Sequence, residues 1–194
     1  MDAAFTVMAQ RGITGGTTRA ICAEAGVHQS VFHYCFRSKK ELYQELVRVV
    51  VVEMVDAAVL AETAESDAEA FIRSSLDLVW ASAVAHPDRQ LVAYELTTLV
   101  LRDPELADLA AWQYQQYFEQ AERLALAVEE AADVEWTVPL PVLSRMLTSV
   151  MDGLIIGWLA DRNDEVAKAS LTRFADYFAS LTTPRKGRAA GSKE

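Results

Sequence analysis

The chain has 194 residues, of which 52% are hydrophobic, and a formal net charge of −10. This length is sufficient to bury one or two hydrophobic cores, and two cysteines are too few for a disulfide scaffold, which favours a reducing cytoplasm. The longest apolar run, residues 47–52, is interrupted by Arg48. The sequence therefore predicts a cytoplasmic protein with no signal peptide, no membrane span and no membrane partner.

The charge is unevenly distributed. Residues 1–48 carry six Lys or Arg and four Asp or Glu, a balance of +2, whereas the remaining residues carry 12 basic and 24 acidic groups. A basic end on an acidic body lets a polyanion approach that end alone. A difference of this size also arises by chance, so it supports a nucleic-acid partner only together with other signals.

The first part of the chain predicts three short helices. Residues 2–10, 18–25 and 29–35 each repeat apolar side chains at spacings of three and four. Gly26 separates the second from the third, and a glycine can take the left-handed conformation that ends a helix and turns the chain.

The third of these helices is short and polar. We expect it to bury Val31 and Phe32 and to direct its polar side chains outward, namely Gln29, Ser30, His33 and Tyr34. A short polar helix held across another by a tight turn is the arrangement that enters the DNA major groove. The segment therefore predicts a DNA-binding protein.

The chain after this segment is almost wholly helical in pattern. Ser38 and Glu41 have the spacing of a capping box, in which each side chain accepts from the other's main-chain N–H. Residues 183–194 mix basic and small side chains and predict a disordered basic tail. No strand pattern is present, so we expect an all-α fold of about nine helices, the last six at residues 39–62, 66–87, 88–101, 104–132, 139–161 and 163–181.

Several motifs at fixed spacing resemble a known family. Thr17-Thr18, the run from Ile21 to Val27 and the segment FHYCFRSKKEL are similar to the DNA-binding domain of TetR-type (TetR/AcrR) bacterial repressors. The resemblance implies a three-helix, helix-turn-helix head at residues 1–46 and a ligand-binding and dimerisation domain at 47–182. It also implies three partners: a double-stranded DNA operator, a small-molecule effector and a second copy of the chain.

The sequence departs from the family pattern in the recognition segment. His28 and Ser30 replace the common Ser and Gly, His33 stands where Tyr is usual, and Cys35 replaces the usual His. The hydroxyl of Ser30 could reach a base edge or a phosphate.

We expect the DNA contacts to come from residues 17–39. Gln29 and Ser30 are the candidates for base edges, and His33 or Tyr34 can add to them. The candidates for phosphate contacts are Thr17, Thr18, Arg19, Tyr34 and Lys39.

The body places polar residues on otherwise apolar helix faces. Buried polar groups are usually hydrogen-bonded, and a small ligand between helices could satisfy them. The candidate pocket residues, which predict a neutral or cationic, fairly apolar effector, are Trp80, Tyr94, Thr98, Gln113, Tyr117, Met146 and Met151. The alternative is that these side chains pack and bond within the chain, which would give a filled body and a constitutive DNA-binding or scaffold protein.

The last two predicted helices carry features typical of helix–helix association. Gly153 and Gly157 lie one turn apart, and glycine costs helix stability that close approach of another helix can offset. The resemblance implies that these two helices form the dimer interface, through Gly153, Gly157, Trp158, Leu171, Phe174 and Phe178. The alternative is ordinary packing within one chain.

Two other classes of site are disfavoured by spacing. The possible metal ligands are Cys22, His28, His33 and Cys35. Their spacing matches no common zinc pattern, so we predict no metal site. The possible catalytic groups are His86, Asp88, Glu95 and Asp152. They form no nucleophile–base motif, so we predict that the protein is not an enzyme. No glycine-rich phosphate loop is present, and we expect no cofactor.

Overall fold

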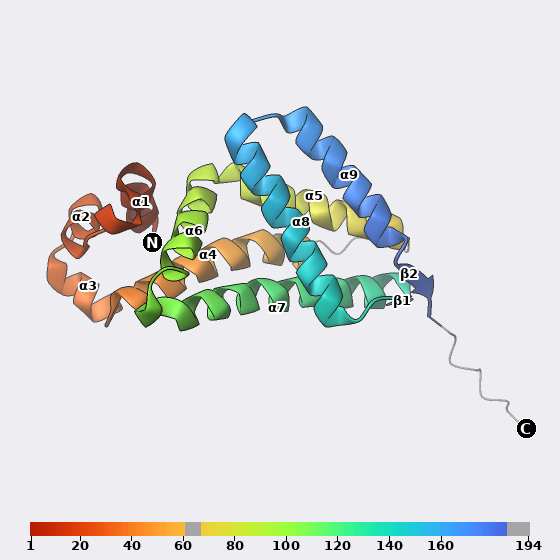
Figure 1. Cartoon of the computed structure of the whole chain (residues 1–194), viewed down its shortest axis with the longest axis horizontal. Helices are drawn as coiled ribbons and strands as arrows, with labels where there is room; N and C mark the ends of the chain where they lie inside the picture. The colour runs from red at the N-terminus through yellow and green to blue at the C-terminus, as the bar shows by residue number, and fades with distance from the viewer. Residues whose placement is uncertain (61–66, 186–194) are drawn as a thin grey trace, which may run out of the picture.

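The computed structural model describes residues 1–60 and 67–185, which are almost entirely helical (Figure 1). The prediction of an all-α protein with an N-terminal head and a helical body is confirmed. Nine α-helices lie within the described ranges, together with a short 3-10 helix, η1 (Pro104–Leu106). They are α1 (Asp2–Gly15), α2 (Thr18–Glu24), α3 (Gln29–Cys35), α4 (Lys39–Leu60), α5 (Ala68–Ala85), α6 (Pro87–Val100), α7 (Ala107–Ala132), α8 (Leu140–Asp161) and α9 (Asp164–Ala179).

Two short strands depart from the prediction. Strand β1 (Val134–Trp136) pairs antiparallel with β2 (Thr182–Pro184), so residues 183 and 184 of the predicted disordered tail are ordered. Asp133 ends α7 with a φ of 51° and turns the chain back, which places Val134 in the core. These strands are three residues each, too short to show an alternating pattern in sequence. The rest of the predicted tail lies outside the described residues.

The predicted helix signals in the head are present, with one difference. Gly26 has a φ of 66°, as the turn between α2 and α3 requires. The Ser38 hydroxyl accepts from the N–H of Glu41 at 3.1 Å. The Glu41 carboxylate accepts from the N–H of Arg37 at 2.7 Å instead of from Ser38, so the predicted reciprocal capping box is wrong in this half.

The head and body are joined by a shared hydrophobic core. One cluster of buried side chains runs from α1–α4 into α6 and the start of α7, and Met8, Leu42, Leu96 and Leu109 belong to it. A second cluster fills the space between α5, the rest of α7, α8 and α9. Helix α4 extends from the head deep into the body (Figure 1). A movement of α4 or α6 therefore changes the packing of the head.

The junction between head and body is also held by polar contacts. Gly12 kinks α1 with a φ of 73°, and the N–H of the next residue, Ile13, donates to Glu95 of α6 at 2.9 Å. Arg89 of α6 pairs with Asp2 of α1 at 2.9 Å. The contacts of α1 with the body are therefore concentrated on α6.

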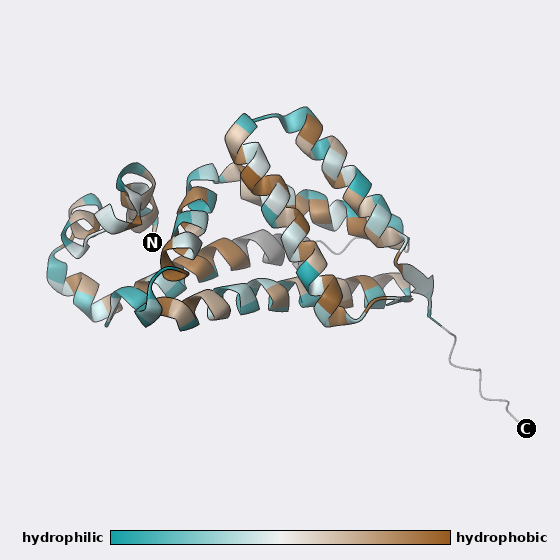
Figure 2. Cartoon of the chain, viewed as in Figure 1, coloured by the Kyte–Doolittle hydropathy of each residue, from teal (hydrophilic) through white to brown (hydrophobic). Residues whose placement is uncertain are grey.

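Helix α8 is the most apolar long helix of the body (Figure 2). In the described part of the chain it is the one helix long and apolar enough to cross a membrane, judged by length and composition only, which the sequence analysis did not predict. Its inner side packs against α7 and α9, with Leu143 and Ile155 almost fully buried. Such burial is typical of a core helix in a helical bundle, and it accounts for one side of α8.

Candidate DNA-binding head and ligand pocket

The predicted DNA-contact residues lie on the surface of the head. Thr18 is half-buried, and the other seven are exposed: Thr17, Arg19, Gln29, Ser30, His33, Tyr34 and Lys39. Among the large hydrophobic side chains of the described residues, Tyr34 is the most exposed, with 91% of its surface exposed. Phe32 is buried as expected, but Val31 is 43% exposed, so α3 is anchored through Phe32 and the prediction for Val31 is wrong.

His28 has a structural role that the sequence analysis missed. It is the N-cap of α3, and its Nδ1 accepts from the N–H of Ser30 at 3.3 Å and lies 3.0 Å from the Ser30 hydroxyl. Ser, Thr, Asp and Asn are the preferred N-cap residues, so a histidine does not signal a cap in sequence. The ring of His28 consequently fixes the position of the Ser30 side chain at the start of the recognition helix.

The two neighbouring lysines at the start of α4 have different surroundings. Lys40 pairs with Asp108 of α7 and so contributes to the junction between head and body. Lys39 is exposed and makes no ion pair with a residue of the described chain. Thr17 caps α2, with its hydroxyl accepting from the N–H of Ala20 at 3.2 Å.

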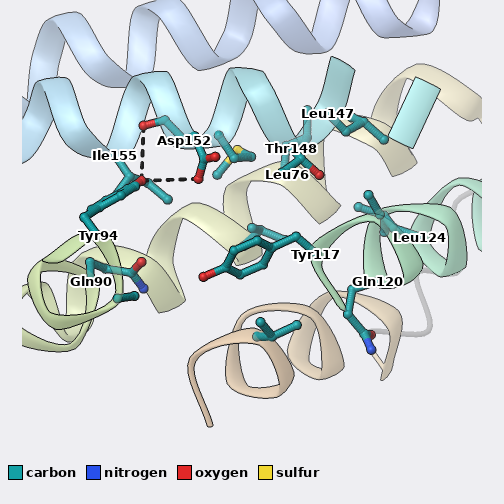
Figure 3. Close-up of a pocket in the computed structure, with 15 residues that line it drawn as sticks. Leu76, Gln90, Tyr94, Tyr117, Gln120, Leu124, Leu147, Thr148, Asp152 and Ile155 are labelled. Atoms are coloured by element: carbon teal, nitrogen blue, oxygen red, sulfur yellow. Dashed lines mark hydrogen bonds between the residues drawn. The ribbon is translucent and has the colours of Figure 1, made fainter. Parts of the chain in front are cut away.

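A pocket lies between the helices of the body (Figure 3). It contains about 700 Å³ of space between atoms, including its opening to solvent. Its wall combines side chains of α4, α5, α6, α7 and α8, most of them aliphatic. The polar side chains among them are Gln90, Tyr94, Tyr117, Gln120, Thr148 and Asp152.

Three of the seven predicted pocket residues line this pocket: Tyr94, Tyr117 and Met151. Trp80 instead packs in the core against Trp158, with ring centroids 6.0 Å apart, and Met146 packs against the same cluster. Thr98 is exposed, and its hydroxyl donates to the carbonyl of Glu95. The preceding residue of α6, Thr97, is buried instead. The inward face of the helix is thus one residue away from the predicted position.

Gln113 lies behind the pocket wall. Its side chain is fully buried, and its Nε2 donates to the Thr97 hydroxyl at 2.8 Å and to the Tyr117 hydroxyl at 3.2 Å. The Oε1 atom of Gln113 is buried and has no hydrogen-bond partner among residues 1–60 and 67–185. The predicted polar residue on this apolar face is therefore used within the chain, and it connects Tyr117 in the pocket to α6.

Asp152 lines the pocket, although it is not among the predicted pocket residues. The Tyr94 hydroxyl donates to the main-chain oxygen of Asp152 at 3.1 Å and lies 3.4 Å from Oδ1 (Figure 3). The Tyr114 hydroxyl donates to Oδ2 at 3.2 Å. Burial raises the pKa of the Asp152 carboxyl above its usual value, and the two tyrosine hydrogen bonds lower it by less. A carboxylate in the middle of an apolar helix was the available signal, since α8 otherwise carries hydrophobic residues on both sides of it.

The predicted interface residues of α8 and α9 divide into two groups. Leu171 and Phe178 are 1% exposed and pack within the protomer, and Trp158 packs on Trp80. Phe174 is 36% exposed. Gly153 and Gly157 are also exposed, and a Cβ added to either would meet, outside the adjacent backbone of α8, no atom of the described residues within 4 Å.

The arrangement of the head defines a class of protein. Two short helices joined by a tight turn, with an exposed polar recognition helix, form a helix-turn-helix DNA-binding head on a helical body. The family model for bacterial regulatory proteins of the tetR family matches residues 1–46, and that for the tetracyclin repressor-like C-terminal domain matches residues 66–179. The chain belongs to the TetR family of bacterial transcriptional regulators.

Solved structures share the fold over nearly the whole chain. A TetR-family transcriptional regulator from Syntrophomonas wolfei is 11% identical with a TM-score of 0.76, covering 98% of this chain and 95% of that one. A transcriptional regulator from Rhodococcus sp. is 16% identical with a TM-score of 0.70, covering 93% and 94%. A transcriptional regulator from Saccharomonospora viridis, in complex with choline, is 19% identical with a TM-score of 0.61, covering 92% of each chain. No curated protein matches the chain.

Proposed function

We propose that this regulator is a ligand-responsive repressor, which binds a palindromic operator as a homodimer and releases it when a small, fairly apolar effector enters the body. The observation that carries the proposal is the position of α6. Its side chains Gln90 and Tyr94 line the pocket, while Glu95 accepts the hydrogen bond from the kink of α1 in the head. One helix thus contacts both the effector site and the DNA-binding head.

This position of α6 provides a route for regulation. An effector changes DNA affinity only if it binds more tightly to the arrangement of helices that fits DNA poorly. Val51 of α4 also lines the pocket, and α4 begins at the head with Lys39. Separation of α4 and α6 by an effector would reorient the head, because both helices share its core.

The head supplies the DNA contacts in this proposal. Gln29 and Ser30 at the start of α3 reach base edges, with His33 or Tyr34 adding to them. The phosphate contacts come from Thr17, Thr18, Arg19, Tyr34 and Lys39. All eight residues come from the segment 17–39, and seven of them are exposed while Thr18 is half-buried, which supports this assignment.

The outer side of α8 and α9 supports the homodimer. Ile156 is 52% exposed and Tyr177 is 50% exposed, next to Gly153, Gly157 and Phe174. This side is too apolar for a solvent-facing surface, and a second copy would cover it while its helices approach the open glycines. Two heads related by a two-fold axis would then bind half-sites of an inverted repeat.

The alternative is a constitutive DNA-binding protein with a filled body. A close-packed bundle would favour it, and the pocket between α4 and α8 favours the ligand-responsive protein. The choline bound to the Saccharomonospora viridis regulator is consistent with a small-molecule site in a protein of this fold.

The test is selection from a pool of random DNA duplexes by the purified full chain. We expect enrichment of an inverted repeat, bound with an affinity that falls steeply with salt because Lys and Arg displace counterions from phosphates. Small molecules that raise the thermal midpoint of the protein are then added to the complex, and some of them release the DNA. The absence of any enriched duplex would reject the proposal, and release by no stabilising compound would favour the constitutive alternative.

A further inference from the structure

We infer that the effector is an organic cation with a hydrocarbon body, whose ammonium group binds at the carboxylate of Asp152 between tyrosine side chains. This inference rests on the proposed function, since it names the chemical class of ligand that the pocket accepts. Four features carry it: the carboxylate, its hydrogen bonds, the aromatic rings beside it and the aliphatic wall opposite.

The first feature is a pocket carboxylate without a cationic partner. The side chain of Asp152 is directed from α8 into the space between the helices (Figure 3). No Lys, Arg or His of residues 1–60 and 67–185 forms an ion pair with it. Arg145, on the same helix, is exposed and lies over the ring of Phe118, 4.6 Å from its centroid. The position complementary to the Asp152 charge is therefore open to a ligand.

The second feature is the orientation of this carboxylate. The Tyr114 hydroxyl donates to Oδ2 of Asp152, and the Tyr94 hydroxyl, which donates to the main-chain oxygen of Asp152, lies 3.4 Å from Oδ1. Burial raises the pKa of both tyrosines, so both hydroxyls remain protonated. The hydrogen bond from Tyr114 and the nearby Tyr94 hydroxyl favour the ionised carboxylate and fix its plane. An ionised group removed from water is costly when unpaired, so a bound cation would gain more here than at an exposed aspartate.

The third feature is the aromatic surroundings. Tyr94 and Tyr117 line the pocket from α6 and α7, and Tyr117 packs edge-on against Tyr114 with centroids 5.6 Å apart. A cation is attracted to the face of an aromatic ring, and the attraction is greater in a desolvated site. A neutral group could gain only a hydrogen bond to the carboxylate, without the attraction between opposite charges, and an anion would be repelled by it.

The fourth feature is the wall around the rest of the ligand, which determines how apolar that part must be. Away from Asp152 most of the wall is aliphatic, with Val51, Leu76, Val79, Leu124 and Leu147, and its other polar side chains are Gln90, Gln120 and Thr148. One carboxylate and tyrosine hydroxyls are too few oxygen ligands for Ca²⁺ or Mg²⁺. The pocket is therefore complementary to a monovalent organic ammonium ion whose remaining surface is mainly hydrocarbon.

The inference is tested with three compounds that share one apolar body and differ in charge: phenethylammonium, phenethyl alcohol and phenylacetate. Calorimetric titration of the full chain at neutral pH should give the tightest binding for the cation, about tenfold tighter than for the alcohol, and the weakest for the anion. Choline and its neutral carbon isostere, dimethylbutanol, repeat the comparison with a quaternary ammonium. If neither cation binds more tightly than its neutral counterpart, the inference is overturned without any substitution having been made.

The variant Asp152→Asn removes the charge while retaining an acceptor for the tyrosine hydroxyls. We expect the cation and the alcohol to bind it within about twofold of each other. The matched control is Asp77→Asn, which makes the same change in net charge at an exposed position of α5 outside the pocket wall and should retain the preference. A cation preference that survives in Asp152→Asn would overturn the assignment of the ammonium group to Asp152.

The same protein preparations separate this inference from the proposed function. If the cation and the alcohol bind equally and an inverted repeat is still selected, the cationic ligand is rejected and the proposed regulator is retained. If the cation preference depends on Asp152 but no duplex is selected, the binding site is retained and the proposed repressor is rejected.

Discussion

The head and the body of this regulator are constructed differently. The candidate DNA-contact residues of the head come from one continuous segment, residues 17–39, and nearly all are exposed. The pocket of the body is formed by side chains between residues 51 and 155, from five helices. A substitution on the head surface therefore changes one of the proposed contacts with DNA. A substitution in the pocket changes the packing of helices that also hold the head.

The largest effect is expected from breaking the proposed dimer, since two heads bind DNA far more tightly than one. Gly157→Arg adds a large cation on the outer side of α8, where the protomer itself offers no obstacle. We expect a folded monomer whose affinity for the selected inverted repeat is lower by about 100-fold, because linked binding is lost. Sedimentation and DNA titration measure the two effects.

Gly157→Ala is the graded comparison for the dimer, because a methyl group is small and adds no charge, and the protomer has space for it. It should weaken the dimer and the DNA affinity less than Gly157→Arg does. A Gly157→Arg protein that remains dimeric would place the interface elsewhere and weaken the argument from the apolar outer side of α8.

The next largest effect is expected at the junction, where one substitution should change both the packing of the body and the position of the head. Glu95→Leu removes the acceptor of the Ile13 N–H, and an unsatisfied polar group costs about 1–3 kcal/mol of unfolding free energy. Glu95→Gln keeps an acceptor and should lose less. The leucine variant should also respond less to an effector that releases DNA, because α6 no longer holds the kink of α1. An unchanged response would show that the coupling does not pass through Glu95.

Much of the fold follows from local signals that sequence displays directly. Gly26 and the Ser38 cap define the head, and the helix limits of the body follow from proline and from capping residues. The pocket follows these rules less well, because helix phase and tertiary contacts decide it. Thr97 and Thr98 differ by one position, and only the packing of α6 shows which of them is buried.

Two features of the candidate sites, the His28 cap and the pocket position of Asp152, were not predicted from the sequence, for physical reasons. His28 acts as the cap of α3 through a ring nitrogen, although histidine is not a usual capping residue. Asp152 becomes a pocket residue through tyrosines on α6 and α7, which lie 58 and 38 positions away in sequence. No local pattern joins residues over such separations, whereas the residues of the head lie within a few turns of one another.

The lysines at the start of α4 allow a smaller test of the head. Lys39→Ala should lower the slope of log affinity against log salt by about one unit for each head on the DNA, because one phosphate contact is lost. Lys40→Ala is the control, since its partner is Asp108 of the body, and it should leave the slope nearly unchanged. Equal slopes for Lys39→Ala and the unmodified protein would remove Lys39 from the phosphate contacts.

The smallest effect is expected from Asp152→Asn on the stability of the ligand-free protein. Burial raises the pKa of this carboxyl above its ordinary value of 3.8, so the folded chain binds the proton more tightly than the unfolded chain does. The free energy of unfolding therefore decreases as pH rises from the unfolded pKa through the folded one, and the ionised group lowers stability at neutral pH. Asparagine removes this cost. We expect its thermal midpoint to exceed that of the unmodified protein at pH 7, by a margin that shrinks as the pH is lowered towards 4. A margin that grows on acidification would mean that the ionised carboxylate stabilises the ligand-free protein. The buried charge of the body would then cost no more unfolding free energy than the exposed charges of the head.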